Sequence, residues 1–205
     1  MEFKVRVDWY NRCKKKNWSP LIVHGDVVAG FWLIGAWYNT SKNGEYFYGA
    51  YPPTYLDRVM LLFPDFSLHG QILHLFSGSI KGDGRRVITF DINPQLKPNV
   101  VGDAVFLSRY FKEEVFDLIL ADPPYSGNFE KYGVKPFSKK KVLTECSKVL
   151  KSSGFLVWLD THMPQWRKDD GWIYRGNIGL AQSTNHAYRA ILFLEKGDGT
   201  TLHPS

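Results

Sequence analysis

Residues 116–125 read Phe-Asp-Leu-Ile-Leu-Ala-Asp-Pro-Pro-Tyr, a mostly apolar run that ends in an acid, two prolines and a tyrosine. The segment 116–121 has the length and composition of a strand buried on both faces. Two consecutive prolines fix their own φ angles and remove two backbone donors, so we expect the strand to stop at Asp122. The carbonyl groups around Asp122 and Pro123 are then held in place as hydrogen-bond acceptors.

The sequence around this turn predicts a parallel sheet. Apolar runs of strand length recur at 71–76, 86–91, 99–101 and 154–160. Apolar residues at helical spacing predict helices over 54–63 and 138–151. Strands of this kind, interspersed with helices, are typical of an α/β fold with helices on both faces of the sheet. The stretches 172–180 and 186–195 predict an antiparallel pair that closes it.

The length of 205 residues and the hydrophobic content of 44% predict a single domain, 1–205. Residues 51–195 form its expected core. Residues 1–50 are an aromatic-rich N-terminal extension without clear periodicity, for which we expect irregular structure with one or two short strands.

Charge and cysteine content narrow the class of protein. The net charge of +6 favours an acidic partner, although a solvated basic face is also common. The only cysteines, Cys13 and Cys146, form neither a disulfide framework nor a zinc site. The histidines show no metal-ligand spacing, and no secretory signal or membrane-spanning run is present. We therefore expect a soluble, cytoplasmic protein without a metal.

The turn at Asp122 has the chemistry of a receptor for an amino group. In an open parallel sheet, ligands bind beyond the carboxyl ends of the strands. A carboxylate beside fixed carbonyl groups accepts both hydrogens of an NH2 group, and Tyr125 offers a flat face to a planar ring. This combination suits the exocyclic amine of a nucleobase. The alternative is that 122–125 is only a rigid turn after a buried strand.

The residues Asp-Pro-Pro-Tyr at 122–125 resemble the motif of the amino-methyltransferases, which use S-adenosylmethionine to methylate adenine or cytosine amines, mostly in DNA. The resemblance implies a Rossmann-like class I methyltransferase fold and an enzyme that acts on an amine, most readily adenine in DNA. It assigns catalytic roles to Asp122, Pro123, Pro124 and Tyr125.

Other segments match the family in the right order. His-Leu-Phe-Ser-Gly-Ser (74–79) resembles its first motif, and 51–58 resembles the segment that precedes it. Asp91 corresponds to the acid that binds the ribose, and Asp103 to the residue that meets the cofactor's adenine amine. The resemblance thus assigns to cofactor binding Pro53, Thr54, Phe76, Ser77, Gly78, Ser79, Asp91, Ile92, Asp103, Ala104 and Asp122. Taken singly, the two acids fit turn or cap residues equally well.

Two features depart from the family pattern. Ile80 stands where the first motif usually has another glycine, and only residues 80–85 separate the first two strands of the core. A parallel crossover normally includes a helix, so we expect that helix to be lost or cut to one turn. The chain also has no room for a target-recognition domain. We therefore expect that a short segment recognises the target, that target recognition is weak, or that a separate specificity subunit or a homodimer supplies it.

The segment 128–141 mixes lysines with aromatic residues, a pattern suited to phosphates and exposed bases. The lysines expected to bind nucleic acid are Lys131, Lys135, Lys139, Lys140 and Lys141. A solvated basic helix start is the equal alternative. Trp158, Thr161 and His162 follow the next strand and are candidates for lining the same crevice.

Two other functions remain open. The same chemistry can act on RNA or on a protein side-chain amide, although relatives of that kind often have asparagine at the position of Asp122, which favours DNA. Alternatively, the shortened first crossover has removed cofactor binding, and the chain is a non-catalytic nucleic-acid-binding module of the same fold.

Overall fold

One mixed sheet organises the molecule, for which a computed structural model describes residues 1–35, 51–125, 129–130, 134–182 and 188–198. Within these residues the strand order is β1-β2-β8-β9-β7-β6-β3-β4-β5. The strands are β1 (Ile22–His24), β2 (Val27–Ile34), β3 (Ile72–Leu75), β4 (Val87–Asp91), β5 (Val100–Val101), β6 (Phe116–Ala121), β7 (Leu150–Asp160), β8 (Trp172–Gln182) and β9 (Tyr188–Lys196).

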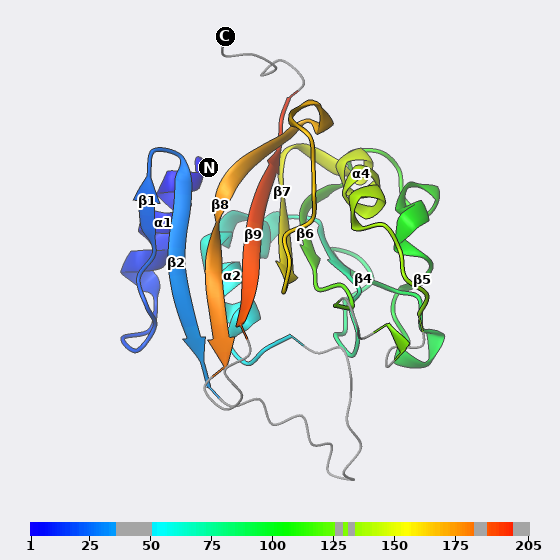
Figure 1. Ribbon diagram of the computed structural model, residues 1–205, viewed down its shortest axis with the longest axis horizontal. Coiled ribbons are helices and arrows are strands. Elements are labelled where there is room, and N and C mark those ends of the chain that lie inside the picture. The colour runs from blue at the N-terminus through cyan, green and yellow to red at the C-terminus, as the bar shows by residue number, and fades with distance from the viewer. Residues whose placement is uncertain (36–50, 126–128, 131–133, 183–187, 199–205) are drawn as a thin grey trace.

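The strands β5, β4, β3, β6 and β7 are parallel neighbours, and β9 runs antiparallel between β7 and β8. The carboxyl ends of the parallel strands therefore meet at one edge, the lower edge in Figure 1. This arrangement confirms the predicted α/β, Rossmann-like class, with a mostly parallel sheet and a C-terminal antiparallel pair. The predicted strand segments all coincide with observed strands.

Helices cover the two faces unequally. Behind the sheet in Figure 1 lie α1 (Phe3–Cys13), α2 (Tyr55–Leu62) and α3 (Pro64–His69), and in front lies α4 (Lys139–Val149). Each side has its own hydrophobic cluster. The helices predicted at 54–63 and 138–151 are confirmed as α2 and α4. None of the helices in the described residues is long and apolar enough to cross a membrane.

The N-terminal extension is more regular than expected. The prediction of irregular structure is wrong for residues 3–13, which form α1, and β2 pairs in parallel with β8 to widen the sheet. Phe3, Val7 and Tyr10 lie on the buried face of α1 at helical spacing. Arg6 is also buried there, with its guanidinium 4.6 Å from the Phe66 ring centroid and paired with Asp65. A buried arginine conceals the amphipathic pattern, which explains the failed prediction.

Four crossovers between parallel strands contain no α-helix in the described residues, and two of them bear on the site. The chain passes from β3 to β4 through residues 76–86 without a helical turn, which confirms the expected loss of the first crossover helix. From β7 to β8, residues 161–171 hold only one 3-10 turn, η4 (Lys168–Asp170). The front face of β2 and β8 is therefore left without a covering helix in the described part of the chain, as Figure 1 shows.

Candidate active site

Asp122 lies immediately beyond the carboxyl end of β6, at the centre of the sheet edge. Ala121, the last residue of β6, pairs with Leu75 of β3 on one side and with Trp158 of β7 on the other. The turn at 122–125 therefore lies beside the turn that begins at Phe76. Pro123 is buried, whereas Asp122, Pro124 and Tyr125 are half-buried. The Tyr125 hydroxyl donates a 2.7 Å hydrogen bond to Oδ1 of Asp122.

The environment of Asp122 opposes its ionisation. The surroundings raise the pKa of its carboxyl group to about 6, with burial as the largest cause and the negative charge of Asp160 as a smaller one in the same direction. The positive charge of Arg189 and the hydrogen bond from Tyr125 act in the opposite direction but only in part offset burial. A carboxyl group with such a pKa changes its charge close to neutral pH, as acids and bases in catalytic sites often do.

Asp160, at the end of β7, is the main residue of this site that the sequence analysis missed. Its side chain is 1% exposed and accepts a 2.5 Å hydrogen bond from Nζ of Lys139, which is 16% exposed. Nε1 of Trp158 and the backbone nitrogen of Thr161 also donate to it, at 3.1 and 2.7 Å. The signal was present, because 154–160 ends an apolar strand with an acid just as 116–122 does. Trp158 is fully buried, whereas Thr161 and His162 are exposed.

Arg189 and two tyrosines complete the surroundings of Asp122. Arg189 lies near the start of β9, with its guanidinium carbon 4.9 Å from the Tyr125 ring centroid. Tyr51 and Tyr55 are buried with their ring centroids 5.1 Å apart, and burial together with the charge of Asp122 raises the pKa of both hydroxyls. The Tyr51 hydroxyl donates to the carbonyl of Leu120. That of Tyr55 has no hydrogen-bond partner among the described residues.

The turn after β3 has an unusual backbone. Phe76 has φ +59°, a left-handed value that is rare for a bulky side chain, and Gly78 has φ +56°. The Phe76 ring stacks on Phe137, with centroids 5.5 Å apart. Ser77 is buried, and its Oγ has no hydrogen-bond partner among the described residues. Strained backbone and an unpaired buried hydroxyl are features that often mark ligand sites. Ser79 is half-buried in the same turn.

Asp91 ties this turn to the end of β4. Its Oδ2 accepts a hydrogen bond from the backbone nitrogen of Gly78 at 2.9 Å, and its Oδ1 accepts one from Asn93 at 2.9 Å. Each carboxylate oxygen has room for a further donor, and the side chain is half-buried. The next residue, Ile92, is exposed.

Asp103 adopts the capping role that was the alternative to cofactor binding. Its Oδ1 accepts a 3.0 Å hydrogen bond from the backbone nitrogen of Val105, at the start of the 3-10 segment η2 (Ala104–Arg109). Asp103 is half-buried, and Ala104 is buried. A cap uses one oxygen, so the carboxylate retains acceptor capacity for a ligand.

The segment before α2 contains a second strained residue. Thr54 has φ +62°, and its Oγ1 accepts a 3.3 Å hydrogen bond from Nε of the buried Arg58. Pro53 precedes it and is half-buried. A β-branched residue in this conformation is a true outlier. Thr54 and Phe76, both assigned to the cofactor by the resemblance, are therefore both held in left-handed backbone.

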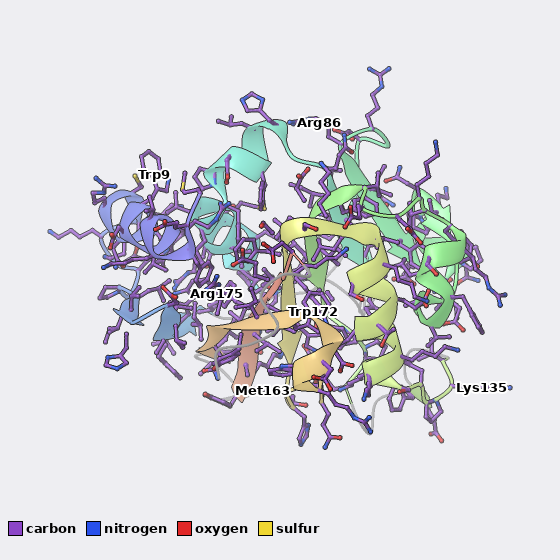
Figure 2. All side chains as sticks on the ribbon, turned by 90° about the horizontal axis from the view of Figure 1, so that it is seen from above. Trp9, Arg86, Lys135, Met163, Trp172 and Arg175 are labelled. Atoms are coloured by element: carbon purple, nitrogen blue, oxygen red, sulfur yellow. The ribbon has the colours of Figure 1, made fainter. Side chains whose placement is uncertain are left out.

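The predicted nucleic-acid lysines separate into distinct environments. Lys139 points inward to Asp160, whereas Lys140 is 42% exposed and lies 4.0 Å from Asp170. Lys141 is exposed, with Nζ 4.3 Å from the Phe106 ring centroid. Lys135 extends from the surface, as labelled in Figure 2. Lys131 lies outside the described residues.

No family model matches this chain, and no curated protein matches it by sequence. Several solved structures resemble it. TrmN from Thermus thermophilus superposes with a TM-score of 0.46 and 18% identity over 66% of this chain, which spans 48% of that protein. A TehB-like SAM-dependent methyltransferase from Corynebacterium glutamicum gives a TM-score of 0.40 and 17% identity, with 62% of this chain and 80% of that one covered. The trans-methyltransferase CalH, in complex with SAH, gives 0.41 and 11%, with 62% and 51% covered.

Proposed function

We propose that the chain transfers a methyl group from S-adenosylmethionine to the exocyclic amine of a nucleobase, with adenine in DNA as the first substrate to test. One observation carries this proposal: the Asp-Pro-Pro-Tyr turn and the Phe76–Ser79 turn are side by side, because Leu75 and Ala121 are paired. A receptor for an amine thus lies next to a strained turn of the kind that approaches a cofactor closely.

The residues at this edge fit S-adenosylmethionine. The Oγ of Ser77, which lacks a partner among the described residues, and the spare acceptor capacity of Asp91 and Asp103 suit a ligand rich in hydroxyl and amino groups. The segments 53–54 and 76–79, with Asp91, Ile92, Asp103 and Ala104, would hold it. When bound there, S-adenosylmethionine supplies an electrophilic methyl group.

The turn's own residues prepare the amine for attack. The Asp122 carboxylate and the Pro123 carbonyl each accept a hydrogen bond from one N–H group of the amine. These two hydrogen bonds draw the nitrogen from its planar form toward a tetrahedral one with an available lone pair. Such acceptors act most strongly when they are fixed in advance. Tyr125 supplies the stacking face and, through its hydroxyl, holds Oδ1 of Asp122. Arg189 favours the ionised carboxylate that this role requires.

The basic surface binds the backbone of the substrate and so brings the target base to Asp122. The exposed Lys135 and Lys141, with the partly exposed Lys140, are suited to phosphates near the start of α4. Lys139 instead joins α4 to β7, because its charge is paired with that of Asp160. A base held inside a duplex must leave the stack to reach Asp122, so unpaired substrates are expected to react faster.

The test is methyl transfer from tritiated S-adenosylmethionine to single-stranded DNA, duplex DNA, RNA and free nucleosides. We expect label in DNA, its loss in Asp122→Ala, and unchanged label in the control Asp8→Ala, whose side chain is exposed on α1. Label in RNA alone would mean that the substrate is RNA and not DNA. No label in any substrate, with Asp122→Ala behaving like the parent, would reject the proposal. Calorimetric titration with S-adenosylmethionine then identifies a non-catalytic module, which shows no heat of association.

A further inference from the structure

Two aromatic rings stand exposed on the open face of the sheet, beside the candidate active site. Phe31 on β2 is 46% exposed and Tyr188 on β9 is 60% exposed. Their rings are stacked, with centroids 6.2 Å apart and planes inclined by 22°. Gly179 of β8 lies under both, and a Cβ there would come within 2.7 Å of the Tyr188 hydroxyl and 2.9 Å of Phe31. We call this pair the Phe31–Tyr188 platform.

The platform is exposed because the helix on the front face does not extend over the whole width of the sheet. Residues 161–171 provide no α-helix over β8, and α4 packs on the part of the front face formed by β6 and β7. Figure 1 shows β2 and β8 uncovered at the front. Leu33 extends the same surface. A single exposed apolar residue is ordinary, whereas a contiguous stacked group marks a binding surface.

The platform adjoins the turn at Asp122. Tyr188 is followed by Arg189, which alternates to the other face of the sheet and places its guanidinium over the Tyr125 ring. The next residue, Ala190, pairs with Asp160. Tyr188 therefore lies one residue along β9 from the arginine that covers the Tyr125 ring.

We propose that the Phe31–Tyr188 platform stacks the base next to the target base, and that the substrate strand is unpaired there. This inference rests on the proposed function, in which the target is a nucleobase. Aromatic rings bind the π-face of any base, and the net charge of +6 attracts the backbone phosphates. Bases inside a duplex are already stacked on each other, so the platform selects single strands.

A second aromatic pair and two basic residues lie toward the start of β8. Trp166 stacks on Tyr174, with centroids 6.1 Å apart, and an open hollow is lined by Lys140, Trp166 and Arg167 among others. An aromatic surface interleaved with cations matches the chemistry of a single-stranded nucleic acid better than that of a second, equally basic copy of this chain.

The test uses a short single-stranded deoxyoligonucleotide with 2-aminopurine next to one adenine. The parent is expected to bind it and quench its fluorescence by stacking. The double variant Phe31→Ala/Tyr188→Ala should bind about tenfold or more weakly and lose the quenching. Tyr188→Leu, which keeps an apolar surface but removes one ring, should lose much of the quenching. Trp9→Ala is the matched control, because Trp9 is 40% exposed on α1, which packs on the opposite face of the sheet (Figure 1).

The outcomes separate this inference from the proposed function, because binding and quenching require no methyl transfer. If the parent binds the oligonucleotide and quenches its fluorescence but transfers no methyl group, the platform is supported and the proposed methyl transfer is rejected. Equal binding and quenching by the parent and the double variant would overturn the platform. A parent dimer that becomes a monomer in the double variant, with oligonucleotide binding unchanged, would also overturn it, since a second copy then covers this face.

Discussion

Asp122 is held in a place that destabilises its ionised form. Its pKa of about 6 in the folded protein lies above the ordinary value of 3.8, so the folded state binds the proton more tightly than the unfolded state does. Stability therefore falls as the pH rises from about 4 to about 6 and remains lower above it. Function at this residue and stability of the fold are opposed.

The first prediction concerns Asp122→Asn, which removes the charge and keeps an oxygen for the Tyr125 hydroxyl. We expect the variant to be more stable than the parent by about 1–3 kcal/mol at pH 7.5 and equal to it near pH 4. Urea unfolding at both pH values measures the difference. A parent that is more stable than Asp122→Asn at pH 7.5 would contradict the assigned environment.

The second prediction concerns the pH dependence of methyl transfer. Only the ionised carboxylate is purely an acceptor for an N–H group of the amine that Asp122 shares with the Pro123 carbonyl, so the single-turnover rate should fall about tenfold per pH unit below pH 6 and level off above it. The control is S-adenosylmethionine binding measured over the same range, which separates the chemistry from cofactor affinity. A flat rate between pH 5 and pH 8 would exclude this role for Asp122.

At the residue scale, the sequence correctly placed Asp91 at the end of its strand and Asp103 and Asp122 in the loops that follow theirs, because an acid after an apolar run is a local signal. It did not reveal Arg189. This residue reaches Tyr125 only because β9 runs antiparallel beside β7, and such pairing depends on contacts distant in sequence.

At the scale of elements, one buried ion pair joins α4 to β7. Lys139 begins the helix, Asp160 ends the strand, and both are largely shielded from water. Removing one partner of such a pair leaves a buried charge, whereas removing an exposed partner changes little.

The third prediction is that Lys139→Met destabilises the protein by about 3–5 kcal/mol. The control, Lys140→Met, should change stability by less than about 1 kcal/mol, because that lysine is more exposed and 4.0 Å from its acidic neighbour. Chemical denaturation of the two variants measures both values. Equal losses would mean that the pair between α4 and β7 is not the reason for the effect.

Apart from the short helix α3 and the 3-10 segments, the helices and strands of residues 51–195 could be predicted because each carries its own periodicity, as α4 does through Val142, Cys146 and Val149. The N-terminal helix could not be predicted, because Arg6 is a polar residue whose side chain is buried against aromatic rings. Parallel pairing of β2 with β8 joins segments almost 150 residues apart, and no local pattern specifies it.

At the scale of the whole molecule, the N-terminal extension belongs to the core that supports the site. Phe3 lies 5.4 Å from Phe155 and 5.6 Å from Phe193, centroid to centroid, and so joins α1 to the central strands β7 and β9. In the residues that the structure describes, the N-terminal extension therefore belongs to the hydrophobic cluster behind the sheet.

The fourth prediction follows from this packing. Phe3→Ala should destabilise the protein by about 3–5 kcal/mol, because it removes a buried ring from the contact between α1 and the sheet. Trp9→Ala, on the same helix but 40% exposed, should change stability by less than about 1 kcal/mol. Thermal and urea unfolding compare them. A mild effect of Phe3→Ala would show that the extension is dispensable to the core.

The most direct test of the central claim is to identify the methylated product by mass spectrometry. Single-stranded DNA is incubated with the protein and with S-adenosylmethionine that carries a deuterated methyl group, and its nucleosides are then separated. The fifth prediction is a deuterated methyl group on the exocyclic nitrogen of adenine, absent from the Asp122→Ala reaction. A label on a ring nitrogen or ring carbon, or a product that persists without the Asp122 carboxylate, would contradict the assignment of this turn as the receptor for an amine.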